Sequence, residues 1–92
     1  MNQKQAEIRA LSVLTWVVGN EELLPVFLGS TGASESDLRL RVGESEFLAS
    51  VLDFLMMDDA WVIQYCDGEN LPYDTPMRAR QSLPGGGDVS WT

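Results

Sequence analysis

The chain has 92 residues and a net charge of −8, from 14 acidic and 6 basic side chains. This length allows one domain with a modest core and excludes two domains. The negative charge repels nucleic acid and anionic membranes, so any basic site would have to be a local patch. The one cysteine, Cys66, excludes an internal disulfide and fits a reducing compartment.

No segment of the sequence predicts export or membrane insertion. The first residues are polar, unlike those of a signal peptide. The longest apolar stretch, 47–57, is interrupted by Ser50 and Asp53 and is shorter than a helix that spans a bilayer. We therefore expect a cytoplasmic protein that does not enter a membrane.

Apolar spacing predicts two helices at the start of the chain. Residues 4–18 place apolar side chains three and four positions apart, which is typical of an amphipathic helix. The expected buried face of this helix carries Ile8, Leu11, Leu14 or Thr15, and Val18. Asn20 is expected to cap a second helix, and Gly32 is expected to end it in a left-handed conformation.

The third and fourth helices are predicted in the middle of the chain. Ser34, with Asp37 three residues later, forms a capping box that begins the third helix, and Gly43 ends it. The fourth helix, about 44–56, is apolar around most of its circumference and is expected at the centre of the fold. Its one polar strip consists of Glu46, Ser50 and Asp53.

Two more helices and a tail complete the chain. Asp58 caps a fifth helix, which Asn70 ends, and Asp74 opens a sixth helix that runs to about Leu83. A glycine-rich tail covers residues 84–92. No segment alternates apolar and polar residues for the length of a strand. We predict a single all-α domain, a compact bundle of about six short helices.

The two halves of the chain, about 4–42 and 43–83, resemble each other. When the sequence is shifted by 38 residues, Leu14 falls on Leu52, the cap Asn20 on the cap Asp58, and Gly32 on Asn70. With one inserted residue, the arginines at 39 and 41 fall on those at 78 and 80. This pattern predicts a pseudo-twofold duplication of a three-helix unit. The alternative is that any two pairs of amphipathic helices would align this well.

The residue types argue against an enzyme. The chain has no histidine, which removes the most common general base and metal ligand. Cys66 lies on the predicted apolar face of the fifth helix and is expected to be a buried side chain rather than a nucleophile. We expect no catalytic residue, no cofactor and no metal. An enzyme that uses acidic residues with a metal or ligand is a weaker alternative.

Seven residues are candidates for an interaction surface. Trp91, in the tail, is expected to fill a groove on the helices or to mark an exposed binding patch. Met56 and Met57 lie at a helix junction, where methionines either form an adaptable surface or pack in the core. Local positive charge, or ordinary ion pairing, is expected at Arg39, Arg41, Arg78 and Arg80.

We expect the partner to be an unidentified protein, with a second copy of the chain among the candidates. Nucleic-acid binding is the alternative hypothesis, because residues 28–38 have the outline of a helix-turn-helix and the arginines would supply positive charge. The segment that would meet the bases begins with Glu35 and Asp37, which repel phosphate groups. A nucleic-acid partner is therefore disfavoured.

Several short segments of the sequence resemble a known family over nearly the whole chain. They are Phe27-Leu28, Thr31-Gly32, Leu38-Arg39, the run from Phe47 to Leu55, Asp58-Asp59, Ala79-Arg80 and the run from Leu83 to Gly86. They resemble the domain of unknown function 3572 family, a group of small uncharacterised proteins from alphaproteobacteria. The resemblance implies a compact helical bacterial protein and supplies no activity, cofactor or catalytic residue. Asp53, shared with that pattern, is the one position at which it leaves a polar role open.

Overall fold

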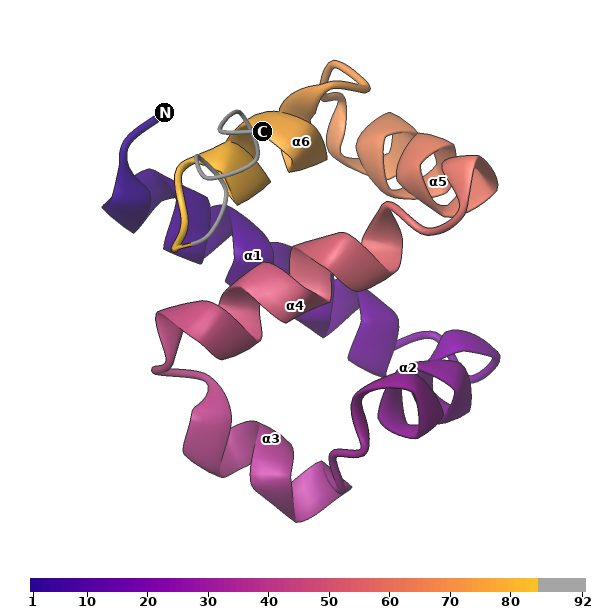
Figure 1. Cartoon of the computed structure of the whole chain (residues 1–92). Helices are drawn as coiled ribbons and strands as arrows, with labels where there is room; N and C mark the ends of the chain where they lie inside the picture. The colour runs from indigo at the N-terminus through magenta and orange to yellow at the C-terminus, as the bar shows by residue number, and fades with distance from the viewer. Residues whose placement is uncertain (85–92) are drawn as a thin grey trace, which may run out of the picture.

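The computed structural model describes residues 1–84, which form six α-helices and no strand (Figure 1). The helices are α1 (Gln3–Val18), α2 (Leu23–Thr31), α3 (Glu35–Arg41), α4 (Ser45–Leu55), α5 (Asp59–Glu69) and α6 (Thr75–Gln81). The predicted all-α class is confirmed for this part of the chain. None of these helices has the length and apolar content needed to cross a bilayer.

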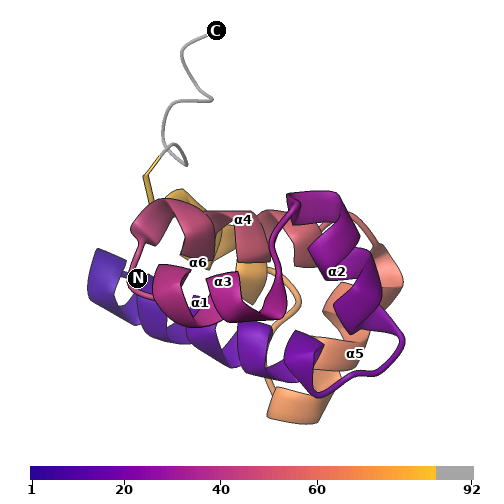
Figure 2. The same cartoon turned by 90° about the horizontal axis from the view of Figure 1, so that it is seen from below.

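The helices α1 and α4 cross at the centre of the molecule (Figure 1). Helix α6 packs against both of them, and α2 also contacts both. Seen from below, α4 and α1 lie in different layers, with α3 and α2 on the viewer's side (Figure 2). The remaining helices, α3 and α5, lie at the periphery, so their outer faces are open to solvent.

Side-chain caps begin three of the six helices, α1, α3 and α5, where they satisfy donors that have no partner within the helix. The Ser34 hydroxyl accepts from the Asp37 N–H, and the Asp37 carboxylate accepts from the Ser34 N–H, so the predicted capping box is confirmed. Asp58 accepts from the Ala60 N–H at the start of α5. A second capping box, between Asn2 and Gln5, begins α1 and was not predicted.

Asn20 also accepts from backbone N–H groups, although α2 begins three residues later than the cap predicted for it. The Asn20 side chain accepts from the N–H groups of Glu22 and Leu23, and the intervening residues form a turn. The predicted helix ends are confirmed at Gly32, with φ +71°, and at Asn70, with φ +56°. These two residues turn the chain from α2 into α3 and from α5 towards α6.

The core centres on α4, as predicted. Its buried side chains are Phe47, Leu48, Ala49, Val51, Leu52, Phe54 and Leu55. The predicted polar strip stays at the surface, where Glu46 and Asp53 are exposed and the Ser50 hydroxyl donates to the Phe47 carbonyl. Burial of this apolar face therefore fixes the position of α4 against α1 and α6.

The buried face predicted for the first helix is wrong for most of its residues. Ile8, Leu11 and Val18 are 60%, 39% and 45% exposed. The buried face instead consists of Ala6, Ala10, Val13, Leu14 and Val17. Because α1 packs against both α4 and α6, its small alanines allow the close approach that larger side chains would prevent. The sequence pattern predicted that the larger side chains of this helix are buried, but most of them are exposed in the structure.

Three edge-on aromatic pairs connect the halves of the chain: Trp16–Tyr65, Phe27–Phe54 and Phe27–Phe47. The Trp16 and Tyr65 rings have centroids 5.9 Å apart, and the Phe27 and Phe54 rings have centroids 5.2 Å apart. The interplanar angle is 76° in both of these pairs. Such edge-to-face contacts add specific geometry to apolar burial, so each pair fixes a helix of one half against a helix of the other.

Candidate functional site

An apolar groove with a volume of approximately 420 Å³ lies between α1 and α3, and we call it the α1–α3 groove. The residues that line it are Leu11, Leu14, Thr15, Val18, Leu24, Glu35, Leu38, Arg39 and Val42. Six of the nine are aliphatic, and Glu35 and Arg39 are the two charged ones. A groove of this composition is suited to burying apolar side chains, with a few charges to orient them.

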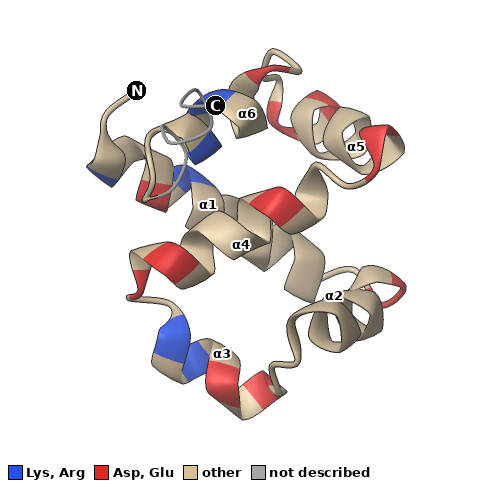
Figure 3. Ribbon diagram, viewed as in Figure 1, with Lys and Arg blue, Asp and Glu red and all other residues tan. Residues whose placement is uncertain are grey.

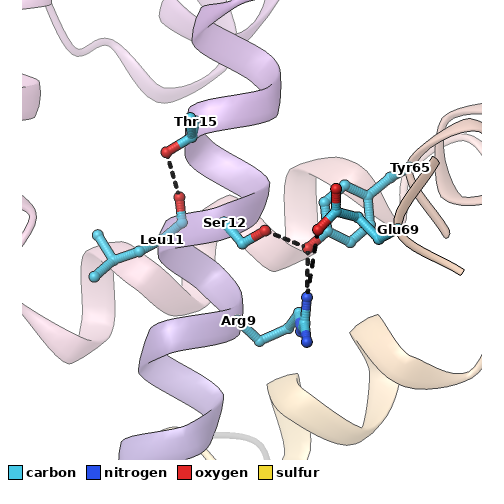
Figure 4. A network of polar contacts seen from close by, with 6 residues as sticks. All are labelled: Arg9, Leu11, Ser12, Thr15, Tyr65 and Glu69. Carbon is cyan, nitrogen blue, oxygen red and sulfur yellow. Dashed lines mark hydrogen bonds and ion pairs between the residues drawn. The ribbon is translucent and has the colours of Figure 1, made fainter. Parts of the chain in front are cut away.

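Helix α1 has two distinct faces, and one of them forms a wall of the groove (Figure 4). Arg9 and Ser12 point towards Tyr65 on α5, whereas Leu11 and Thr15 lie on the other side of the helix. The Thr15 hydroxyl donates to the Leu11 carbonyl at 2.9 Å, so its hydrogen-bonding capacity is met within α1. This wall therefore presents an apolar surface.

Helix α3 supplies the opposite wall. It is only seven residues long, and Leu38 is its one buried residue. Glu35 and Arg39 lie one helical turn apart on the groove side. Its capping box fixes the start of the helix, which holds both side chains in register along the groove.

Opposite charges lie near the two ends of α1 (Figure 3). Lys4 is exposed at the amino-terminal end. Glu21 and Glu22 follow the carboxyl-terminal end, where they share a shallow hollow with Thr15. The exposed apolar stripe of α1, which consists of Ile8, Leu11 and Val18, therefore runs from a basic end to an acidic end.

The four predicted arginines do not form one basic patch. Arg39 lines the α1–α3 groove. The Arg41 guanidinium lies 4.8 Å from the centroid of the Phe47 ring, and its Nε is 3.4 Å from Glu44. The Arg80 Nε is 2.8 Å from the Asp53 carboxylate. Ion pairing accounts for both Arg41 and Arg80, and it gives Asp53, where the resemblance left a polar role open, a partner in Arg80.

The other predicted surface residues are also separated. Arg78 is exposed near the start of α1, beside Met1 and Ile8. Met57 is 69% exposed and lines a hollow of approximately 320 Å³, whereas Met56 is half-buried against the core. Trp91 lies outside the described residues. The structure therefore divides the predicted surface among several places, and only Arg39 reaches the α1–α3 groove.

A polar contact that the sequence did not predict joins α1 to α5 (Figure 4). The Tyr65 hydroxyl lies 2.7 Å from the Ser12 hydroxyl, and Arg9 donates to it at 3.1 Å. Glu69 is 4.0 Å from the same arginine. Tyr65 itself is buried, and its ring packs edge-on against Trp16. No local spacing could have indicated this contact, because its residues are far apart in the sequence.

Several titratable groups have a pKa that departs from its ordinary value, and the structure gives the cause. Burial raises the pKa of the Cys66 thiol, and the predicted burial of this side chain is confirmed. Hydrogen bonds from Ser45 and Gln3 lower the pKa of Glu7. In the described part of the chain, no three His, Cys, Asp or Glu side chains are grouped so as to hold a metal ion.

A family model described as "Protein of unknown function (DUF3572)" matches residues 3–86. The chain belongs to the DUF3572 family. The resemblance seen in the sequence is therefore confirmed. Comparison of this DUF3572 protein with curated proteins and with solved structures gives no match.

Of the residues that line the groove of this DUF3572 protein, only Arg39 was predicted to lie on an interaction surface. The apolar spacing of α1 did single out Leu11 and Val18, but as core residues. Their exposure follows from the packing of the alanine face of α1 against α4 and α6. Only the tertiary structure distinguishes the two apolar faces of this helix.

Proposed function

We propose that this DUF3572 protein is a non-enzymatic protein-interaction module that binds an apolar helix in the α1–α3 groove. One observation carries the proposal. Leu11 and Val18 remain exposed on a helix whose opposite face is already fully buried. Exposed aliphatic side chains gathered beside a groove are typical of protein-interaction sites. A helix that presents side chains at positions i, i+3 or i+4 and i+7 matches a groove between two helices.

The charge distribution supports a protein rather than a nucleic acid as the ligand. The first turn of α3 carries Glu35 and Asp37, and Glu21 and Glu22 lie beside the groove. Four carboxylates at this surface oppose the approach of a phosphate backbone. Arg41 and Arg80 are engaged with carboxylates of the chain itself. No observation favours the nucleic-acid alternative.

The proposal includes the duplication predicted from the sequence. Its support is that positions 38 apart share their environment: Val13 and Val51 are both buried, and Gly32 and Asn70 are both left-handed. The same shift exchanges two of the three edge-on aromatic pairs, because position 16 falls on 54 and position 27 falls on 65. The third helices fit less well, because Leu38 is buried and Met77 is exposed.

An experimental structure provides the test of the duplication. Residues 4–32 should superpose on residues 42–70 after the molecule is rotated by about half a turn, because crossed contacts of this kind are exchanged by a twofold axis. A rotation far from half a turn, or failure of the two segments to superpose, would contradict it.

Site-specific photocrosslinking tests the interaction function. A photoreactive phenylalanine analogue is placed at Val18 in the groove and, as a matched control, at Leu40, which is on α3 and 80% exposed but does not line the groove. Irradiation in a cell extract should give a discrete protein adduct at position 18 only. The adduct should disappear when Leu11 is replaced by lysine. Equal labelling at both positions, or no adduct at position 18, would overturn the proposal.

A further inference from the structure

We infer that the helix bound in the α1–α3 groove is α1 of a second copy of this chain, packed antiparallel about a twofold axis. This inference rests on the proposed function, because it names the occupant of the same groove. Three features of the chain support it: the order of apolar residues along α1, the charges at the two ends of α1, and the charges of α3.

The exposed residues of α1 form a sequence that pairs with itself when reversed. In an antiparallel pair centred on position 13, Ile8 lies opposite Val18 of the second copy, and Leu11 lies opposite Thr15 of the second copy. Positions 8 and 18 are equally distant from position 13, and so are positions 11 and 15, so both pairs have the same centre. A twofold interface requires this reciprocity: if residue i of one copy contacts residue j of the second, then residue j of the first copy contacts residue i of the second.

The charges at the two ends of α1 favour the antiparallel direction. Lys4 lies seven residues before Leu11 and therefore on the same face of α1. Glu22 lies beyond the other end and is equally far from position 13. Antiparallel packing brings Lys4 close to Glu22 of the second copy, and the twofold axis forms this contact twice. Parallel packing would instead place lysine near lysine and glutamate near glutamate, which is repulsive.

Helix α3 adds a second pair of opposite charges to the same groove. Glu35 and Arg39 both line it, one turn apart. A twofold axis that reverses the helix direction can place Glu35 near Arg39 of the second copy in both directions. The net charge of −8 on each copy opposes association, but it is screened beyond about 8 Å at physiological ionic strength, whereas close pairs are less affected. We therefore expect a weak dimer whose population rises with protein concentration.

Sedimentation equilibrium of the purified full-length chain tests this inference. The wild-type protein should show a concentration-dependent monomer–dimer equilibrium. Leu11→Lys should weaken the association at least tenfold, because it places two charges in the apolar centre of the interface. The matched control Leu40→Lys changes a leucine outside the groove and should leave the association unchanged. Circular dichroism verifies that both variants are folded.

Charge reversal tests the direction of packing. Lys4→Glu alone and Glu22→Lys alone should each weaken the dimer about tenfold or more, because each creates two like-charge contacts. The double variant should return to within about threefold of the wild-type dissociation constant. In the control double variant, Glu46→Lys replaces Glu22→Lys; Glu46 is an exposed acid on α4, so this change should restore nothing. Failure of the Lys4/Glu22 double variant to recover would overturn the antiparallel arrangement.

The remaining outcomes separate this inference from the proposed function. A protein that stays monomeric, but crosslinks from position 18 to a different protein in extract, would overturn the second copy as occupant and leave the interaction function standing. A monomer without any groove-specific adduct would overturn both. A dimer that persists in Leu11→Lys would use another surface and would also overturn the inference.

Discussion

Gly32 and Asn70 are the residues with positive φ in the described chain, and each ends a helix. A side chain with a Cβ costs about 1–2 kcal/mol in this conformation. Gly32→Ala should therefore lower the free energy of unfolding by about 1 kcal/mol, although an added methyl group meets no neighbouring atom within 4 Å. Urea unfolding followed by circular dichroism measures this change.

Gly29 provides the matched control for Gly32. It lies inside α2, and an added Cβ there also meets no atom within 4 Å. Because alanine favours the helix interior over glycine, Gly29→Ala should raise the free energy of unfolding by about 0.5–1 kcal/mol. Changes of the same sign at both positions would contradict the assignment of Gly32 as a left-handed helix end.

Cys66 is the residue whose chemistry the fold suppresses most clearly. Its side chain is buried, and burial, followed by the negative charge of Asp67, raises the pKa of its thiol. Because the thiolate is the reactive form, an aromatic disulfide reagent at neutral pH should modify the native protein at least tenfold more slowly than the urea-unfolded protein. Equal rates under the two conditions would show that the fifth helix leaves its apolar face open.

At the scale of the elements, two carboxylates make the stability of the fold depend on pH. Hydrogen bonds from Ser45 and Gln3 lower the pKa of Glu7, and those from Ser34 lower the pKa of Asp37, relative to ordinary values of 4.5 and 3.8. A lowered pKa in the folded state means that the ionised carboxylate stabilises the fold. This contribution is fully present above the ordinary pKa and disappears as pH falls through the lowered value.

The urea midpoint should therefore be constant above about pH 5.5 and fall as the solution is acidified below about pH 4.5. Ser45→Ala should reduce this fall, because it removes the largest cause of the lowered pKa of Glu7. Ser30→Ala, a change of the same size on the exposed surface of α2, should keep the full fall. Identical pH profiles for the two variants would contradict the role of Glu7.

The contact between α1 and α5 depends on one hydroxyl. Tyr65→Phe keeps the buried ring but removes the group that joins Ser12 and Arg9. The free energy of unfolding should fall by about 1 kcal/mol, the net value of a typical hydrogen bond. In the Ser12→Ala background the same substitution should cost less, and a double-mutant cycle measures the difference. Strict additivity would show that the two hydroxyls do not interact.

The elements differ in how far the sequence predicts them. Helix starts and ends follow from single residues such as Ser34, Asp58 and Asn70, because capping chemistry is local. The burial of α4 follows from its nearly continuous apolar surface. The orientation of α1 does not follow, because it has one apolar face of alanines and valines and another of larger side chains. Which of them is buried depends on α4 and α6, which lie far along the chain.

The same reason explains the mixed result for the candidate site. Arg39 was predicted and lines the groove, but Leu11 and Val18 were assigned to the core, so the groove itself was missed. The arginine pairs looked alike in sequence, yet Arg39 lines the groove whereas Arg78 lies beside Met1 and Ile8. Residue spacing predicts a shared helix face, whereas contacts between helices decide what that face meets.

At the scale of the whole molecule, the crossing of α1 and α4 organises the remaining helices (Figure 1). Helix α6 closes tightly on both central helices, whereas α3 buries only one residue and leaves the groove beside α1. A fold with one closed side and one more open side can keep its stability and its binding surface in different places. The proposed dimer would use the exposed face of α1 and the groove beside α3.

Ala6 and Ala10 of α1 and Ala79 of α6 are fully buried, and α1 packs against α6, so these small side chains allow a close approach of the helices. A larger side chain at these positions would push the helices apart, so only residues of equal or smaller volume are tolerated there. The opposite face of α1 carries no such restriction. Recognition can therefore diversify by substitution on one side of a single helix, while the architecture is preserved by the other.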